Sequence, residues 1–101
     1  LAEYGLSDFE YSVILGFHQF DFGNKKHKIL IEVHGDYWHC NPKLYKEPKS
    51  SAQIKNIEKD KIKADFARKH NMKLYIIWEK DIKEGNFYVL EQIKKSIDKN
   101  T

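Results

Sequence analysis

The stretch IEVHGDYWHC, residues 31–40, decides how the rest of the sequence is interpreted. It closes an apolar run that begins at Lys28, and the run ends at a glycine. Glu32 lies within the run, and His34, Asp36 and His39 follow closely. Unpaired charge inside a protein is costly, so ionisable side chains at the end of a buried strand need a partner or a ligand. We therefore expect this strand end to form part of a functional site.

The bulk composition sets wide limits. The chain has 101 residues, which suits one domain over residues 1–101. Its net charge of +3 permits a polyanionic partner without requiring one, and solvated helix faces explain the lysines equally well. A single cysteine excludes an internal disulfide and fits a reducing compartment. No apolar run approaches the roughly 20 residues of a membrane span.

The first residues, LAEYG, are typical of the end of a helix. We therefore expect the chain to be a C-terminal fragment of a longer protein.

Several stretches rich in β-branched and aromatic residues predict strands: residues 9–17, 18–22, 27–34 and 72–78. GNKK at 23–26 is a turn signal, so residues 17–34 are predicted to form a hairpin. The last of these strands is nearly all apolar, and we expect it in the centre of the sheet.

Two helices are predicted. The first covers residues 51–70, capped by Ser50 or Ser51 and ended by Asn71 in a left-handed conformation. The second follows Asn86 and carries one apolar stripe: Val89, Leu90, Ile93 and Ile97. The order predicts an α/β fold, a small mixed β-sheet flanked by helices, with the first helix as a right-handed crossover.

A set of acids and histidines falls on this scaffold. Glu32 and His34 are two apart on a strand and share a face, which Asp21 can reach from the neighbouring strand, just before the turn. We expect two carboxylates and an imidazole at a sheet end to hold a hard divalent cation, Mg²⁺ or Mn²⁺. Such an ion activates water and neutralises charge on a phosphodiester.

The first helix adds an acid to this set. Asp60 falls on the same helix side as Ile57, Ala64 and Ala67, which we expect to face the sheet. An inward acid needs a partner, and His39 or His34 would supply one. Such an Asp–His couple fixes the tautomer of the imidazole and raises its basicity.

Each of these residues also has a structural interpretation. Asp21 would then be a turn residue, Glu32 a paired strand acid, and Asp60 an exposed helix residue. His34 and His39 would be hydrogen-bonded core histidines. The convergence of all five favours a functional site.

Four segments carry a family resemblance: FDF (20–22), IEVHGDYWH (31–39), NIEKDK (56–61) and LYIIWE (74–79). In this order and spacing they resemble the very-short-patch-repair (Vsr) branch of the PD-(D/E)XK nucleases. HGDYWH is the most specific segment. The chain is most similar to the nuclease domain of phage intron-encoded homing endonucleases with an EDxHD active-site pattern.

The resemblance implies a restriction-endonuclease-like core and a role for each acid and histidine. Asp21 and Glu32 match the metal-binding acids. His34 stands where most of the superfamily has Lys, and would contact the phosphate or the leaving group. His39 matches the general base, and Asp60 the acid that supports it.

The resemblance also implies a double-stranded DNA substrate. Tyr37 and Trp38 match aromatics that wedge between base pairs, which bends the duplex; core packing is the alternative for Trp38. Further DNA contacts are predicted for Lys43, Lys46, Lys49 and Asn56. Site recognition would come from a separate DNA-binding domain, and the protein would act in the cytoplasm of a bacterial or phage-infected cell.

Two features depart from the family pattern. The family's first acid lies on an upstream helix, most of which we expect to precede Leu1, and only Glu3 or Glu10 could replace that acid within this sequence. Cys40 has no second cysteine, so no structural zinc is expected.

The leading hypothesis is a Mg²⁺-dependent homing endonuclease domain. One alternative is a mismatch-nicking repair enzyme. The other is a nuclease-like fold that only binds nucleic acid, with lysines on the phosphates: Lys43, Lys46, Lys49 and Lys55.

Overall fold

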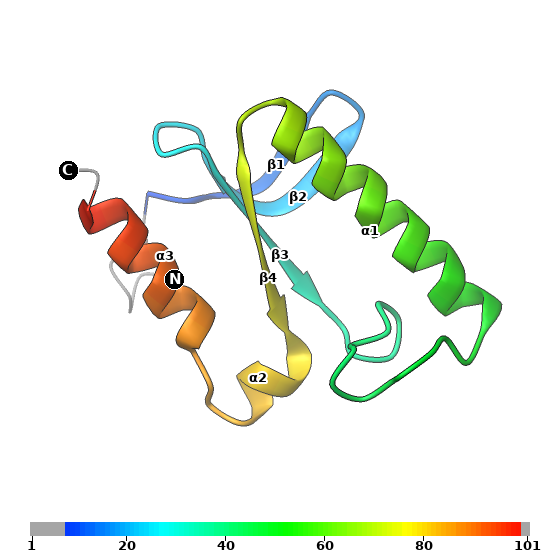
Figure 1. Ribbon diagram of the computed structural model, residues 1–101. Helices are drawn as coiled ribbons and strands as arrows, with labels where there is room; N and C mark the ends of the chain where they lie inside the picture. Colours follow the sequence, from blue (N-terminus) through cyan, green and yellow to red (C-terminus); the bar gives the residue numbers. More distant parts are fainter. Residues whose placement is uncertain (1–7, 100–101) are drawn as a thin grey trace.

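A four-stranded mixed sheet with helices on both faces makes up the described part of the chain, residues 8–99, in the computed structural model (Figure 1). The elements are β1 (Glu10–Leu15), β2 (His18–Asn24), β3 (Ile29–His34), α1 (Ser51–Lys69), β4 (Lys73–Trp78), α2 (Glu79–Lys83) and α3 (Tyr88–Lys99). The first three strands form an antiparallel meander, and β4 runs parallel to β3 after the α1 crossover. The predicted α/β class with a small mixed sheet and flanking helices is confirmed. The LAEYG segment and Glu3 lie outside the described residues.

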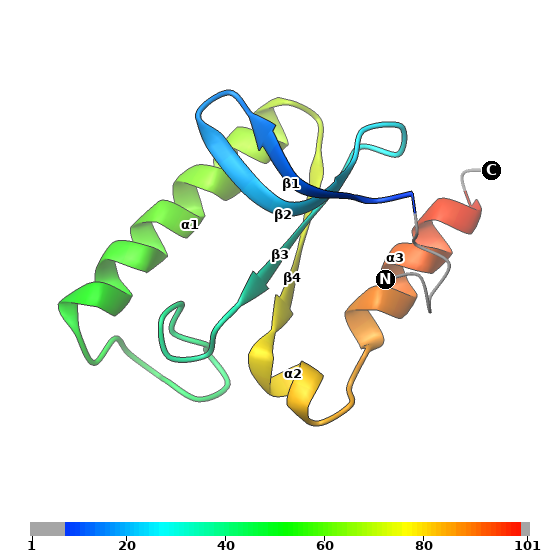
Figure 2. The ribbon, with the colours of Figure 1, turned by 180° about the vertical axis from the view of Figure 1, so that it is seen from behind.

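The two faces of the sheet have separate cores. On the side of α1, Leu30 and Phe20 pack with Ala67, whereas Ile31 packs with Ile93 on the side of α3. Figure 2 shows the same arrangement from behind, with α1 and α3 on opposite sides of the strands. Because side chains alternate along a strand, Glu32 and His34 of β3 share the α1 face with Leu30.

The N-terminal strand is shorter than predicted. It ends at Leu15, which pairs with His18, so residues 16–17 form a tight turn. Gly16 has a φ of +61°, a conformation that favours glycine. The next strand, β2, runs on to Asn24, whose side-chain oxygen accepts a hydrogen bond from the His27 amide and closes the turn to β3. Asp21 therefore lies inside β2, and the prediction that it immediately precedes the turn is wrong.

The position of β4 also differs from the prediction. Among residues 8–99, the sheet order β1-β2-β3-β4 places it at an edge, beside β3 only. Its apolar composition has another cause, since α1 and α3 both pack against it. A strand covered on both faces is apolar whether or not it is central. The short helix α2, directly after β4, was not predicted.

The predicted helix ends are confirmed. Ser50 caps α1 by accepting a hydrogen bond from the Gln53 amide at 3.2 Å, and Asn71 has a φ of +57° after its end. Asn86 accepts a hydrogen bond from the Tyr88 amide, and the apolar stripe of α3 packs into the core.

The sheet-facing stripe of α1 is more polar than predicted. Ala64 is exposed, and the helix side that meets the sheet carries residues at spacings of three and four: Gln53, Asn56, Asp60, Lys63 and Ala67. Among residues 8–99, no helix has the length and apolar character needed to cross a bilayer.

Candidate active site

Asp21 and Glu32 lie where β2 and β3 part. Backbone pairing between these strands last occurs at Phe22 and Ile31. Beyond that pair, the Asp21 amide donates to Glu32 Oε1 at 3.0 Å, and the Val33 amide donates to Asp21 Oδ2 at 2.7 Å. Each carboxylate therefore accepts a hydrogen bond from a backbone amide of the opposing strand.

The strand is irregular at Asp21. Phe20 packs in the core under α1, whereas Phe22 packs against the core under α3. Residues two apart on a regular strand share a face, so the alternation breaks between them. On β1, at the register position opposite Asp21, Ser12 has a φ of +58°, which is uncommon for a non-glycine residue. The break accompanies the turning of the Asp21 carboxylate onto the backbone of β3.

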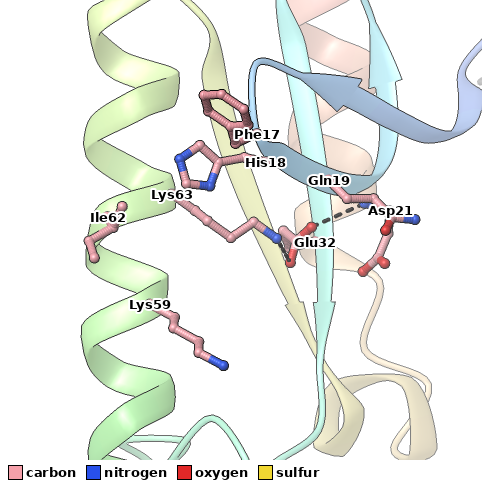
Figure 3. Close-up of a pocket in the computed structure, with 8 residues that line it drawn as sticks. All are labelled: Phe17, His18, Gln19, Asp21, Glu32, Lys59, Ile62 and Lys63. Carbon is pink, nitrogen blue, oxygen red and sulfur yellow. Dashed lines mark hydrogen bonds and ion pairs between the residues drawn. The ribbon is translucent and has the colours of Figure 1, made fainter.

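Glu32 is a buried, ionised acid. Its side chain is 9 % exposed, and Lys63 Nζ on α1 lies 2.9 Å from Glu32 Oε2. Burial raises the pKa of Glu32, but the nearby His34 imidazole, the Lys63 ammonium and the hydrogen bond from the Asp21 amide outweigh it, so the pKa lies below its usual 4.5. Figure 3 shows Lys63 reaching from α1 to Glu32, with Asp21 beyond it.

Asp60 joins the two histidines. His39 Nδ1 lies 2.8 Å from Asp60 Oδ2, so the predicted contact between Asp60 and a histidine is present. His34 Nε2 lies 3.9 Å from Asp60 Oδ1 and 3.7 Å from Glu32 Oε2. The two imidazole rings are stacked, with centroids 3.9 Å apart. Contacts therefore run without interruption from Asp21 through Glu32, His34 and Asp60 to His39.

The loop that carries His39 is hydrogen-bonded to two side chains of α1. Gln53 Nε2 donates to the Tyr37 carbonyl at 2.6 Å, and Asn56 Nδ2 donates to the Trp38 carbonyl at 2.7 Å. Gln53 is fully buried. Both amides fix the backbone just before His39, so they set where its imidazole meets Asp60. Asn56 was predicted to contact DNA, and in the structure its side-chain amide binds the Trp38 carbonyl of this loop.

Asp36 has a different role from the other ionisable residues of its segment. Its Oδ1 accepts hydrogen bonds from Asn41 Nδ2 at 3.0 Å and from the Lys80 amide at 3.2 Å. The Asp36 amide in turn donates to Glu79 Oε1 at 3.3 Å. Asp36 thus joins the loop to the first turn of α2, where an acid is also favoured by the helix dipole.

The residues predicted to touch DNA are at the surface. Tyr37 is 41 % and Trp38 58 % exposed, with their rings edge to face, so core packing of Trp38 is wrong. Lys43 and Lys49 are exposed and form ion pairs with Asp81 and Glu47. Lys46 and Lys55 are also exposed.

Two cavities adjoin the chain of contacts. One, of about 480 Å³, is lined by Asp21 and Glu32 together with Lys59 and Lys63 of α1. The other, of about 590 Å³, lies between α1 and β4 and contains the second group: His34, His39 and Asp60. The acid pair and the histidine pair open into separate hollows on the α1 side of the sheet.

Asp21 and Glu32 have the donor type that Mg²⁺ and Mn²⁺ prefer, carboxylate oxygens from neighbouring strands beside one cavity. Glu32 already stabilises a positive charge, the Lys63 ammonium, at this place.

His34, His39 and Asp60 also bring three donor atoms within 4.8 Å of one another. The two rings lie 9° from parallel, so their in-plane lone pairs do not converge on one point. One ring must turn before both bind the same ion.

Sequence reasoning missed Lys63, Gln53 and the structural role of Asp36. The spacing of Gln53, Asn56, Asp60 and Lys63, at intervals of three and four, was the available signal, because it places them on one helix side. No equivalent signal predicts that Asp36 contacts α2, since the Lys80 amide is 44 residues away.

Comparisons with protein-family models, with curated proteins and with solved structures gave no match.

Proposed function

We propose that this chain is the nuclease domain of a divalent-metal-dependent DNA endonuclease, with a Vsr-like PD-(D/E)XK core as in homing endonucleases. The observation that carries the proposal is the uninterrupted set of contacts from Asp21 to His39. Its members come from β2, β3, the following loop and α1. A purely structural role does not require two carboxylates, two stacked histidines and a third acid at one place.

Asp21 and Glu32 would hold the Mg²⁺ ion. Bound there, the ion would supply Lewis-acid activation of water and neutralise charge on the scissile phosphodiester. The backbone hydrogen bonds from Val33 and Asp21 preset the directions of the two carboxylates, so little ordering is needed on binding.

His39 would be the general base. Asp60 Oδ2 would accept a hydrogen bond from His39 Nδ1, so Nδ1 would carry the hydrogen. His39 Nε2 would then keep the lone pair that takes a proton from water. Asp60 also stabilises the imidazolium that results. About a quarter of each of these two side chains is exposed, which leaves His39 accessible to a substrate.

His34 fits a positioning role better than direct contact with the phosphate. Its side chain is 5 % exposed and lies beneath the His39 ring. A hydrogen on Nε2 would face Glu32 and Asp60 and link the metal-binding acid to the acid that holds the base. Trp78 packs edge-on against the same ring and limits its rotation.

DNA would lie across the surface that carries Tyr37 and Trp38. These exposed rings have the amphipathic shape that stacks on or wedges between bases. The nearby lysines, Lys43, Lys46 and Lys49, would contact phosphates. A separate recognition domain would supply most of the sequence preference.

Plasmid nicking tests this function. The protein should convert supercoiled plasmid to open circles in Mg²⁺ and not in EDTA. Asp21→Asn and His39→Ala should each lower the rate by at least about 100-fold, the usual contribution of a metal ligand or general base. Metal-independent nicking, or full activity in either variant, would refute the assignment.

A second candidate is a nuclease-like fold that only binds DNA. The Lys63 ion pair favours it, because Lys63 satisfies Glu32 without a metal ion. This candidate predicts salt-sensitive DNA binding with no cleavage in either Mg²⁺ or Mn²⁺.

A further inference from the structure

Lys63 forms an ion pair with Glu32 of the acid pair, and the proposed reaction leaves this lysine unused. We propose that Lys63 is a built-in counter-ion of Glu32, which the divalent cation displaces and which then binds a phosphate oxygen of the DNA. This inference rests on the proposed nuclease function and adds a residue to its site.

Lys63 differs from an ordinary surface lysine. It lies on the sheet-facing stripe of α1, and its side chain is only 22 % exposed. Its Nζ is 2.9 Å from Glu32 Oε2 and 4.8 Å from the centroid of the Phe20 ring. Lys59, one turn earlier, lines the same cavity from an exposed position and has no ion pair among those found in residues 8–98.

The coordination of Glu32 forces a competition. Its Oε1 accepts from the Asp21 amide, and its Oε2 faces the Lys63 ammonium. A cation held by Glu32 Oε2 and Asp21 would lie beside the Lys63 ammonium, and the two positive charges would repel each other. The amide is fixed in β2, whereas Lys63 is on a flexible four-carbon stem, so Lys63 is the group that moves.

Displacement leaves the ammonium in the cavity beside the bound cation. Two neighbouring positive charges repel unless an anion bridges them, and a DNA phosphate oxygen is such an anion. Lys63 would therefore weaken metal binding in the free protein and favour it when DNA is present.

Mn²⁺ binding without DNA tests this competition. We would compare wild type with Lys63→Gln, Lys63→Arg and the matched control Lys59→Gln, using electron paramagnetic resonance of free Mn²⁺ at neutral pH. Lys63→Gln should bind Mn²⁺ about tenfold more tightly, after allowance for solvent screening of the lost charge. Lys63→Arg should bind no more tightly than wild type, and Lys59→Gln should change the affinity less than about twofold. Unchanged or weaker binding by Lys63→Gln, an equal gain in Lys59→Gln, or no Mn²⁺ binding by any of the proteins would overturn the inference.

A second measurement uses the wild-type protein, in case Lys63→Gln does not fold. Lys63 should react faster with an amine-acylating reagent when Mn²⁺ is added, with Lys59 unchanged, as quantified by mass spectrometry of peptides. No rise at Lys63 would contradict the displacement.

The two proposals fail separately. If Mn²⁺ releases Lys63 but DNA is never cut, the nuclease function is wrong and the counter-ion role stands. If DNA is cut while Lys63→Gln leaves the Mn²⁺ affinity unchanged, only the counter-ion role is wrong.

Discussion

A double-mutant cycle on His39 and Asp60 tests whether the two side chains act as one unit. The contact of 2.8 Å between His39 Nδ1 and Asp60 Oδ2 is a charge-assisted hydrogen bond, a class worth about 1.5–3 kcal/mol. Each tenfold in rate is about 1.4 kcal/mol, so Asp60→Asn should lower the nicking rate roughly 10- to 100-fold. Both side chains are about a quarter exposed, which places the effect in the lower half of that range.

The assay is the initial rate of supercoiled plasmid nicking at saturating Mg²⁺. His39→Ala should cost about 100-fold or more, as is typical for loss of a general base. The double variant should be no slower than His39→Ala alone, because Asp60 acts through that imidazole. Asp65→Asn, an exposed acid on α1 paired with Arg68, is the matched control and should leave the rate unchanged. Losses that multiply in the double variant would refute the couple.

Three further predictions concern stability, each read from urea denaturation. Folding lowers the pKa of Glu32, so its carboxylate stabilises the protein above about pH 4.5 and loses this effect as pH falls through the lower folded value; Glu32→Gln should remove that part of the acid dependence. Asp36→Ala removes two acceptor contacts and should lower the free energy of unfolding by about 1–3 kcal/mol, whereas no change would contradict its role at α2. Gly16→Ala should destabilise the protein more than Gly85→Ala: both have positive φ, but a methyl at Gly16 meets a side chain at 2.9 Å and one at Gly85 meets nothing within 4 Å. Equal losses would refute the steric part of that argument.

Local signals predicted much of the fold. The apolar, β-branched run in residues 27–34, the serine before α1 and Asn71 after it are local signals, and a strand (Ile29–His34) and a helix formed there as expected. The apolar stripe of α3 was also recognisable from its spacing.

These local signals predicted neither the place of β4 in the sheet nor the short helix α2. An apolar strand such as β4 indicates that both faces are covered, and it does not indicate how many strands flank it. The five-residue helix α2 is too short for a periodic pattern, and it is held by Asp36 across a separation of 44 residues.

The site was recognisable in part. Glu32 stood out as an acid inside an apolar strand, and Asp60 as an inward acid on α1. Lys63 did not stand out, because a lysine on a helix is usually solvated. Its contact with Glu32 depends on how α1 packs against β3, which the sequence does not show. The break in β1 and β2 at Ser12 and Asp21 accompanies the packing of Phe20 and Phe22 on opposite faces of the sheet, and a short stretch of sequence does not reveal that packing.

The central claim is that Asp21 and Glu32 hold the catalytic metal ion and that the His39–Asp60 couple supplies the general base. Anomalous diffraction from crystals soaked in Mn²⁺ tests it most directly. We predict a single peak within coordination distance of both carboxylates, with Lys63 moved away from Glu32. A peak held by His34, His39 and Asp60, or no peak at the acid pair at saturating Mn²⁺, would contradict the account.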